Sequence, residues 1–191
     1  MHLKELLKDG FYGYDEQLLP FLKKGLGKYN LICLHTLGSH YPYGGHVPPT
    51  FRQGEGQTPV EAYDRSIRYT DWFLNEVISE LRKLSGPSMM IYISDHGESP
   101  ESRTWRDRTC KDCWEIPMVV WFSEDYRNKF PELVSQVEDA SARPLRTDEL
   151  LQGLLSMCCI KNLKDVADSD IFFSRNFTPC RQRCGTETER E

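Results

Sequence analysis

The stretch Ser88-Met-Met-Ile-Tyr-Ile-Ser-Asp-His-Gly-Glu-Ser99 indicates the fold class of this chain. Its first half is a short, continuously apolar run, which is typical of a strand buried inside a sheet. Its second half changes at once to charged and polar residues. In sheets of parallel strands, ligands bind at the carboxyl ends of the strands. The stretch therefore predicts a buried strand that leads directly into a site.

Similar elements on both sides of this stretch extend the pattern. Residues 29–35 and 116–122 are two further apolar runs of strand length. One helix is predicted from Asp15, a residue type that caps helices, and another from Thr147. The order is then helix, strand, loop, helix, strand, loop, strand, helix. Continuously apolar strands between helices predict an α/β fold with parallel strands.

The helix that follows Thr58 has the clearest helical pattern in the sequence. Thr58 and Glu61 form a capping box around Pro59, which is favoured at the first helical position. Apolar residues then recur at steps of three and four, and residues of mixed charge occupy the other side. We expect this helix to be a scaffold that packs one apolar stripe on the sheet. The expected stripe contains Ile67, Leu74 and Leu81.

The composition narrows the class of protein. The 191 residues carry a formal charge of −5, with 39% hydrophobic and 12% aromatic residues. This fits one globular domain, excludes disorder along most of the chain, and disfavours nucleic-acid binding through a basic face. The longest apolar runs, Met89–Ile93 and Pro117–Phe122, are far shorter than the ~20 residues of a membrane-spanning helix. No apolar secretory signal follows Met1.

The seven cysteines leave at least one without an intrachain partner. Cys110 and Cys113 form a CxxC motif, and Cys180 and Cys184 are separated by three residues. These four have spacings that a structural zinc site can use, and in an oxidising compartment they could instead form disulfides. The other cysteines are interpreted as small apolar residues of the core. They are Cys33, Cys158 and Cys159.

Asp95 and His96 place a carboxylate and an imidazole at the end of the predicted strand. This pair suits zinc or manganese, and Gly97 permits the turn that lets both residues face one ion. Alternatively, Asp95 caps the following segment and His96 has a structural role. Glu98 is interpreted as a carboxylate behind the metal ligands, as a general base, or as an exposed residue.

His35 and His40 occupy the equivalent position after the first predicted strand. His35 ends that strand, and His40 opens a long loop, rich in glycine and proline, over 41–57. Their place at a strand end makes them candidate substrate ligands, and the alternative for His40 is a solvated loop histidine. His46, within the loop, is predicted to be solvated.

Four segments, in this order, carry a resemblance to a known family. They are His35-Thr-Leu-Gly-Ser-His40, Tyr63-Asp-Arg-Ser-Ile-Arg-Tyr-Thr-Asp71, Tyr92-Ile-Ser-Asp-His-Gly-Glu-Ser99 and Ile116-Pro-Met-Val-Val-Trp-Phe122. Over about residues 9–160 the chain resembles the phosphoethanolamine transferase branch of the sulfatase / alkaline-phosphatase superfamily. The resemblance implies a three-layer α/β/α sandwich that is alkaline-phosphatase-like. Residues 1–174 would form the C-terminal portion of the catalytic domain, and residues 175–191 a polar tail.

The resemblance also implies an activity. Enzymes of this branch are anchored in the inner membrane, face the periplasm, and move phosphoethanolamine from a phospholipid to lipid A or another glycan, which modifies lipopolysaccharide. A threonine is the nucleophile and zinc assists it. Asp95 and His96 match two of the zinc ligands, with manganese as the alternative metal. His40 matches the family's histidine that contacts the transferred group or a second metal, and His35 is the other candidate for binding substrate.

The motifs that precede these in the family are not found in the sequence. They include the nucleophilic threonine, one acidic metal ligand and the membrane anchor, so we expect an N-terminally truncated chain that is inactive by itself. Its expected partner is the missing N-terminal portion of the same enzyme. No histidine follows His96, and Arg103, Arg106 or Arg108 could hold phosphate instead. The alternative functions are a non-catalytic metal- or phosphate-binding α/β module and an ester hydrolase of the same superfamily.

Overall fold

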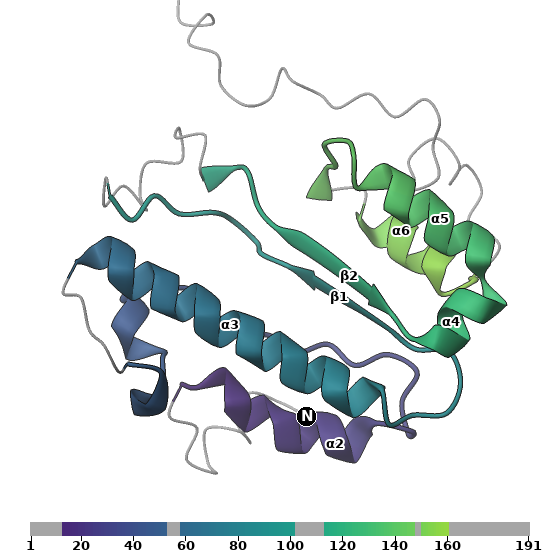
Figure 1. The fold of residues 1–191 in the computed structure, drawn as a ribbon, viewed down its shortest axis with the longest axis horizontal. Helices are drawn as coiled ribbons and strands as arrows, with labels where there is room; N and C mark the ends of the chain where they lie inside the picture. Colours follow the sequence, from purple (N-terminus) through teal and green to yellow (C-terminus); the bar gives the residue numbers. More distant parts are fainter. Residues whose placement is uncertain (1–12, 53–57, 102–112, 148–149, 161–191) are drawn as a thin grey trace, which may run out of the picture. The chain divides into compact units, whose positions relative to one another are not determined.

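A computed structural model describes residues 13–52, 58–101, 113–147 and 150–160 (Figure 1). Its elements are η1 (Asp15–Leu18), α2 (Leu19–Gly25), η2 (Tyr43–Gly45), η3 (Pro49–Phe51), α3 (Pro59–Leu81), β1 (Met89–Ile93), β2 (Met118–Phe122), α4 (Glu124–Lys129), α5 (Pro131–Ala140) and α6 (Leu150–Met157). The chain divides into two compact units, Met1–Trp121 and Phe122–Glu191, and each is described by itself. The predicted boundary between residues 174 and 175 lies outside the described residues.

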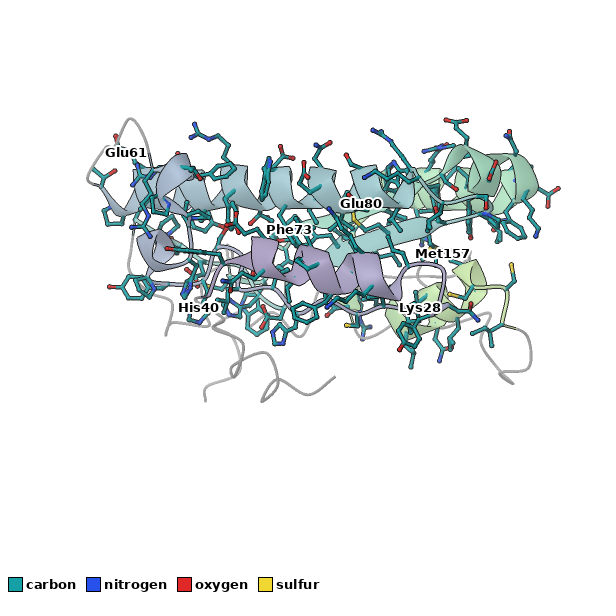
Figure 2. All side chains as sticks on the ribbon, turned by 90° about the horizontal axis from the view of Figure 1, so that it is seen from below. Lys28, His40, Glu61, Phe73, Glu80 and Met157 are labelled. Carbon is teal, nitrogen blue, oxygen red and sulfur yellow. The ribbon has the colours of Figure 1, made fainter. Side chains whose placement is uncertain are left out.

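The first unit has its core where η1 and α2 pack along α3, as Figure 1 shows. Phe73 of α3 is 2% exposed and points toward α2 (Figure 2). Met90 of β1 and Trp121 of β2 pack against the same apolar cluster. The buried cluster contains Leu18, Leu19, Leu22, Phe73, Val77 and Leu81. The strands therefore rest on the core that α2 and α3 form.

The predicted start of α3 is confirmed, and its predicted core face is partly wrong. The Thr58 side chain accepts the Glu61 N–H, and the Glu61 carboxylate accepts the Thr58 N–H at 3.0 Å, so the capping box is present. Ile67, however, is 45% exposed. The buried face follows the two large rings of Tyr69 and Phe73, one helical turn apart, and this turns Ile67 toward solvent.

The predicted strands near 88–94 and 116–122 are confirmed as β1 and β2, which pair in a two-stranded sheet. Beyond the strands, the Gly97 N–H donates to the Cys113 carbonyl oxygen at 3.0 Å. This bond joins the segment after β1 to the segment before β2, as in an antiparallel pair, and the arrows in Figure 1 point in opposite directions. The expectation of parallel strands is therefore wrong for this pair.

Residues 29–35 do not form the predicted buried strand. The segment contains no strand, and from Leu31 to His35 its side chains alternate between exposed and half-buried. Leu31 is 69% exposed, whereas Ile32 and Leu34 pack against the core cluster. Period-two burial is what an extended chain shows when one face contacts a core and the other faces solvent. A continuous apolar run could not reveal this difference, since both faces are apolar.

The second unit contains α4, α5 and α6. The Ser123 hydroxyl accepts the Tyr126 N–H at 3.2 Å and caps α4. The Tyr126 hydroxyl donates to the Met157 carbonyl oxygen at 2.6 Å, which ties α4 to the end of α6. The helix predicted from Thr147 is confirmed in α6. The sequence did not predict α4 and α5, because Pro131 divides the segment into two helices with few apolar positions each.

Candidate functional site

The turn after β1 carries the two candidate metal ligands. The Ser94 hydroxyl donates to the His96 carbonyl oxygen at 2.6 Å, and the His96 N–H donates to Asp95 Oδ1 at 3.1 Å. Asp95 and His96 are both exposed. Together with the hydrogen bond from the Gly97 N–H to Cys113, these contacts fix the backbone of the turn after β1. Both candidate ligands thus face solvent beyond the end of β1.

The His96 ring is oriented by the backbone. Its Nδ1 lies 2.9 Å from the Gly97 carbonyl oxygen. Because a carbonyl oxygen only accepts hydrogen bonds, Nδ1 carries the proton and Nε2 of the neutral ring has the free lone pair. Metal-bound histidines commonly have this arrangement, in which one ring nitrogen is fixed by a carbonyl group and the other binds the metal. The geometry of His96 therefore suits the predicted role.

A second turn carries His35 and His40, and a buried carboxylate anchors it. Asp15 is 2% exposed, and its two oxygens accept the N–H groups of Leu37 at 2.8 Å and Gly38 at 2.9 Å. Burial raises the pKa of Asp15, and the two backbone hydrogen bonds act in the opposite direction. The sequence predicted that Asp15 would cap a helix. Instead its carboxylate binds backbone 22 and 23 residues further along the chain.

His40 projects from this turn beside a third histidine. Figure 2 shows its side chain directed away from α3. Its Nδ1 contacts the Tyr41 carbonyl oxygen, so Nδ1 carries the proton and Nε2 has the free lone pair. The rings of His40 and His46 are 6.1 Å apart, edge to face. The prediction of a solvated His46 is wrong: His46 is half-buried, and the fold brings it against His40.

Glu98 links the turn after β1 to η2, the short helix that follows His40 in the chain. Its carboxylate hydrogen-bonds the hydroxyl of Tyr43, which is 6% exposed, and the ring of Tyr43 packs edge to face on Tyr63 of α3 at 5.1 Å. Burial, followed by the Glu98 carboxylate, raises the pKa of Tyr43. Glu98 Oε2 is buried and has no hydrogen-bond partner among the described residues. Glu98 is therefore not an exposed residue, and Tyr43 is a contact that the sequence did not predict.

The described residues supply part of a metal site. Asp95 and His96 have suitable donor chemistry, but no group of three or more histidines, cysteines or acidic residues within the described ranges could hold a metal ion. Catalytic zinc normally has three protein ligands. Asp95 and His96 thus fit zinc as two of its ligands, and a complete zinc site would need further ligands from outside the described residues. His35 and His40 do not join this pair in a common ligand set.

Most of the cysteine and arginine candidates cannot be placed. Cys110, Cys180 and Cys184, like Arg103, Arg106 and Arg108, lie outside the described residues. Cys113 is buried. The interpretation of the other cysteines as core residues is wrong. Cys33, Cys158 and Cys159 are exposed.

Comparison with known proteins agrees with these motifs. The sulfatase family profile matches residues 4–155. The chain belongs to the sulfatase family, and its relatives place it in the phosphoethanolamine transferase branch. No solved structure matches it at a significant level. Among the residues described, no helix is both long enough and apolar enough to cross a membrane.

The chain is 32% identical over 146 residues to phosphoethanolamine transferase EptA of Helicobacter pylori. The aligned region covers 64% of this chain and 28% of that protein. It is 30% identical over 132 residues to Kdo(2)-lipid A phosphoethanolamine 7''-transferase of Escherichia coli K12, covering 59% and 23%. It is also 26% identical over 197 residues to EptA of Salmonella typhimurium, covering 88% and 35%. The chain thus spans between 23% and 35% of the length of these relatives.

Proposed function

We propose that this chain is part of an enzyme that transfers phosphoethanolamine from a phospholipid to lipid A or another glycan. The observation that carries the proposal is the turn after β1, where Asp95 and His96 are exposed and His96 Nδ1 is held by the Gly97 carbonyl oxygen. This leaves a carboxylate and an imidazole Nε2 available to one metal ion. The names of the relatives support the reaction and the class of acceptor.

In this proposal Asp95 and His96 hold zinc, with manganese as the alternative. When bound, the metal would neutralise negative charge on the phosphoryl oxygens. His40 and His35 bind the transferred group from the neighbouring turn. Glu98, through its hydrogen bond with Tyr43, ties the turn after β1 to the η2 helix that follows His40. The threonine nucleophile and the remaining metal ligands come from a part of the enzyme outside the described residues.

The proposal extends to the architecture and location of the enzyme. The described helices and strands would belong to a three-layer α/β/α sandwich of the alkaline-phosphatase type, completed by an N-terminal portion of the same enzyme. The enzyme would be anchored in the inner membrane, with its catalytic domain on the periplasmic face. The short span of the chain relative to its matched relatives supports a larger enzyme.

The proposal is tested by a zinc-supplemented phosphoethanolamine transfer assay on a longer native form of the enzyme that includes this chain. Asp95→Ala and His96→Ala should each lower transfer by more than about a hundredfold, because loss of a direct ligand exceeds the effect of an outer residue. Asp139→Ala, which removes an exposed carboxylate of α5, is the matched control and should retain activity. Full transfer by either ligand variant would refute the site.

The chain alone should bind zinc weakly and transfer nothing. Titration of the 191-residue chain with zinc, followed by calorimetry, measures the first point. A transfer or phosphodiesterase assay of the same sample measures the second. Robust turnover by this chain that disappears in Asp95→Ala would contradict the proposed need for residues outside it.

A further inference from the structure

The turn between His35 and His40 is specified by a residue outside it. Leu37 occupies the middle of a short relay of hydrogen bonds: its N–H donates to Asp15 Oδ1 at 2.8 Å, and its carbonyl oxygen accepts the His40 N–H at 3.1 Å. Gly38, whose N–H donates to Asp15 Oδ2, has φ of +52°. Glycine adopts this left-handed conformation without steric cost. One carboxylate therefore binds two successive N–H groups of the turn that ends at His40.

The carboxylate is itself fixed by its neighbours. Asp15 is 2% exposed, and the next residue, Glu16, donates its N–H to the Tyr69 hydroxyl at 2.9 Å. Tyr69 is fully buried on α3. Asp15 thus stands on a segment that the core of the first unit holds in place. Hydrogen bonds from N–H groups to an ionised carboxylate are stronger than those to a neutral group, so they suit the fixing of a backbone turn.

The histidines of the site surround this anchor. The Asp15 carboxylate interacts electrostatically with His35 and His46. Two residues before it in the chain, a Cβ atom placed on Gly13 would lie 3.7 Å from His46 Nδ1 and 3.5 Å from Leu37 Cδ1. His46 in turn contacts the ring of His40. The 13–15 segment therefore lies near His35 and His46, and it is linked to His40 through the backbone of Leu37.

We propose that Asp15 is a positioning residue, which sets the place and orientation of His40 through the backbone of Leu37 and Gly38. The role rests on the proposed function, in which His40 binds the transferred group. Asp15 itself touches no reacting atom in this scheme. Loss of the carboxylate should leave the histidines present and the turn free to take other conformations.

Amide hydrogen exchange and NMR spectra of the 191-residue chain test the proposal without any activity measurement. In the native chain, the amides of Leu37 and Gly38 should exchange slowly. In Asp15→Asn they should exchange faster by about ten- to a hundredfold, which is the effect of losing hydrogen bonds to a charged group. The imidazole resonances of His40 should shift in the same variant.

Tyr69→Phe is the matched control. It removes the hydroxyl that accepts the Glu16 N–H, so it destabilises the same segment but keeps the Asp15 carboxylate. It should leave the His40 resonances in place. Equal shifts in both variants would mean that Asp15 acts only through stability. Rapid exchange of the Leu37 and Gly38 amides in the native chain would overturn the proposal even if Asp15→Asn fails to fold.

The experiments distinguish a failure of the positioning role of Asp15 from a failure of the proposed function. If Asp15→Asn shifts the His40 resonances but His40→Ala retains full transfer in the longer enzyme, Asp15 positions the turn and the binding role of His40 is wrong. If His40→Ala abolishes transfer and Asp15→Asn leaves the turn unchanged, the function stands and the positioning role is wrong.

Discussion

The two histidine-bearing turns of the candidate site are held in different ways. The first, which ends at His40, is anchored by Asp15, a residue that is 2% exposed and 22 positions away from Leu37 in sequence. In the second, the described contacts of Asp95 and His96 join residues at most two positions apart, and both residues are exposed. Buried long-range contacts fix a backbone, whereas local exposed ones compete with water.

The described residues therefore fix the conformation of the first turn, whereas the conformation of the second turn also depends on residues outside them. The His40 turn is preorganised by the core of its own unit. The Asp95–His96 turn presents donors that can adapt to a metal ion and to ligands supplied from elsewhere. Preorganised groups bind with less loss of entropy. We therefore expect substitutions in the core to affect the first turn strongly and the second turn weakly.

Phe73→Ala should have the largest effect on this contrast. Removing a ring that is 2% exposed should lower the free energy of unfolding by about 3–5 kcal/mol. Chemical denaturation measures the loss of unfolding free energy. Hydrogen exchange should become faster at the amides of Leu37 and Gly38 much more than at that of His96. Ile67→Ala, at a site 45% exposed, is the control from the same helix. A cost no larger than that of the control would contradict the assigned core.

Tyr69→Phe should lower the free energy of unfolding by about 1–3 kcal/mol, because the Glu16 N–H would lose its partner in a partly buried setting. Thermal or denaturant unfolding measures this. Tyr29→Phe, at a ring that is 69% exposed, should change stability little. If the two substitutions cost the same, the support beneath the first turn is not the Tyr69 hydrogen bond.

Ser94→Ala makes the corresponding change in the second turn. It removes the hydroxyl that donates to the His96 carbonyl oxygen in an exposed setting. The expected change in the free energy of unfolding is within about 0.5 kcal/mol. A loss as large as that of Tyr69→Phe would mean that the second turn is as firmly built as the first, and the contrast between them would fail.

Glu80→Gln should have the smallest effect on stability, and the size of that effect depends on pH. Hydrogen bonds from Lys83 and, secondarily, Lys23 lower the pKa of Glu80 from its ordinary value of 4.5. A lowered folded-state pKa gives stability that is present above 4.5 and is lost as the pH falls through the lower value. The native chain and the variant should therefore converge in stability on acidification. Divergence at low pH would refute this, and added salt should narrow the difference at neutral pH.

The regular elements with strong local signals could be predicted from sequence. The Thr58–Glu61 capping box and Pro59 located the start of α3, and two apolar runs located β1 and β2. The strand expected at 29–35 failed because strand pairing depends on neighbours that are distant in sequence. The antiparallel direction of β2 could not be predicted for the same reason.

The candidate site residues were predicted from their positions after apolar runs, and only the run before Asp95 is a strand. Asp95 and His96 follow the end of β1 after one residue, Ser94, so the rule for strand ends made them candidates. Asp15 was interpreted as a helix cap, since short polar residues before a helix usually are. Its contact with Leu37, the approach of His46 to His40, and the bond between Tyr43 and Glu98 all join separate segments. Composition and periodicity carry no signal for such contacts.

The long sequence separations around Asp15 have a consequence for the order of folding. The contacts of Asp15 with Leu37 and of Glu16 with Tyr69 close loops of 22 and 53 residues, whereas the capping box of α3 is local. Loop closure costs chain entropy that local structure does not. We expect α3 to form before the His40 turn. Asp15→Asn should then speed unfolding and leave the folding rate nearly unchanged, which the two arms of a chevron plot would measure.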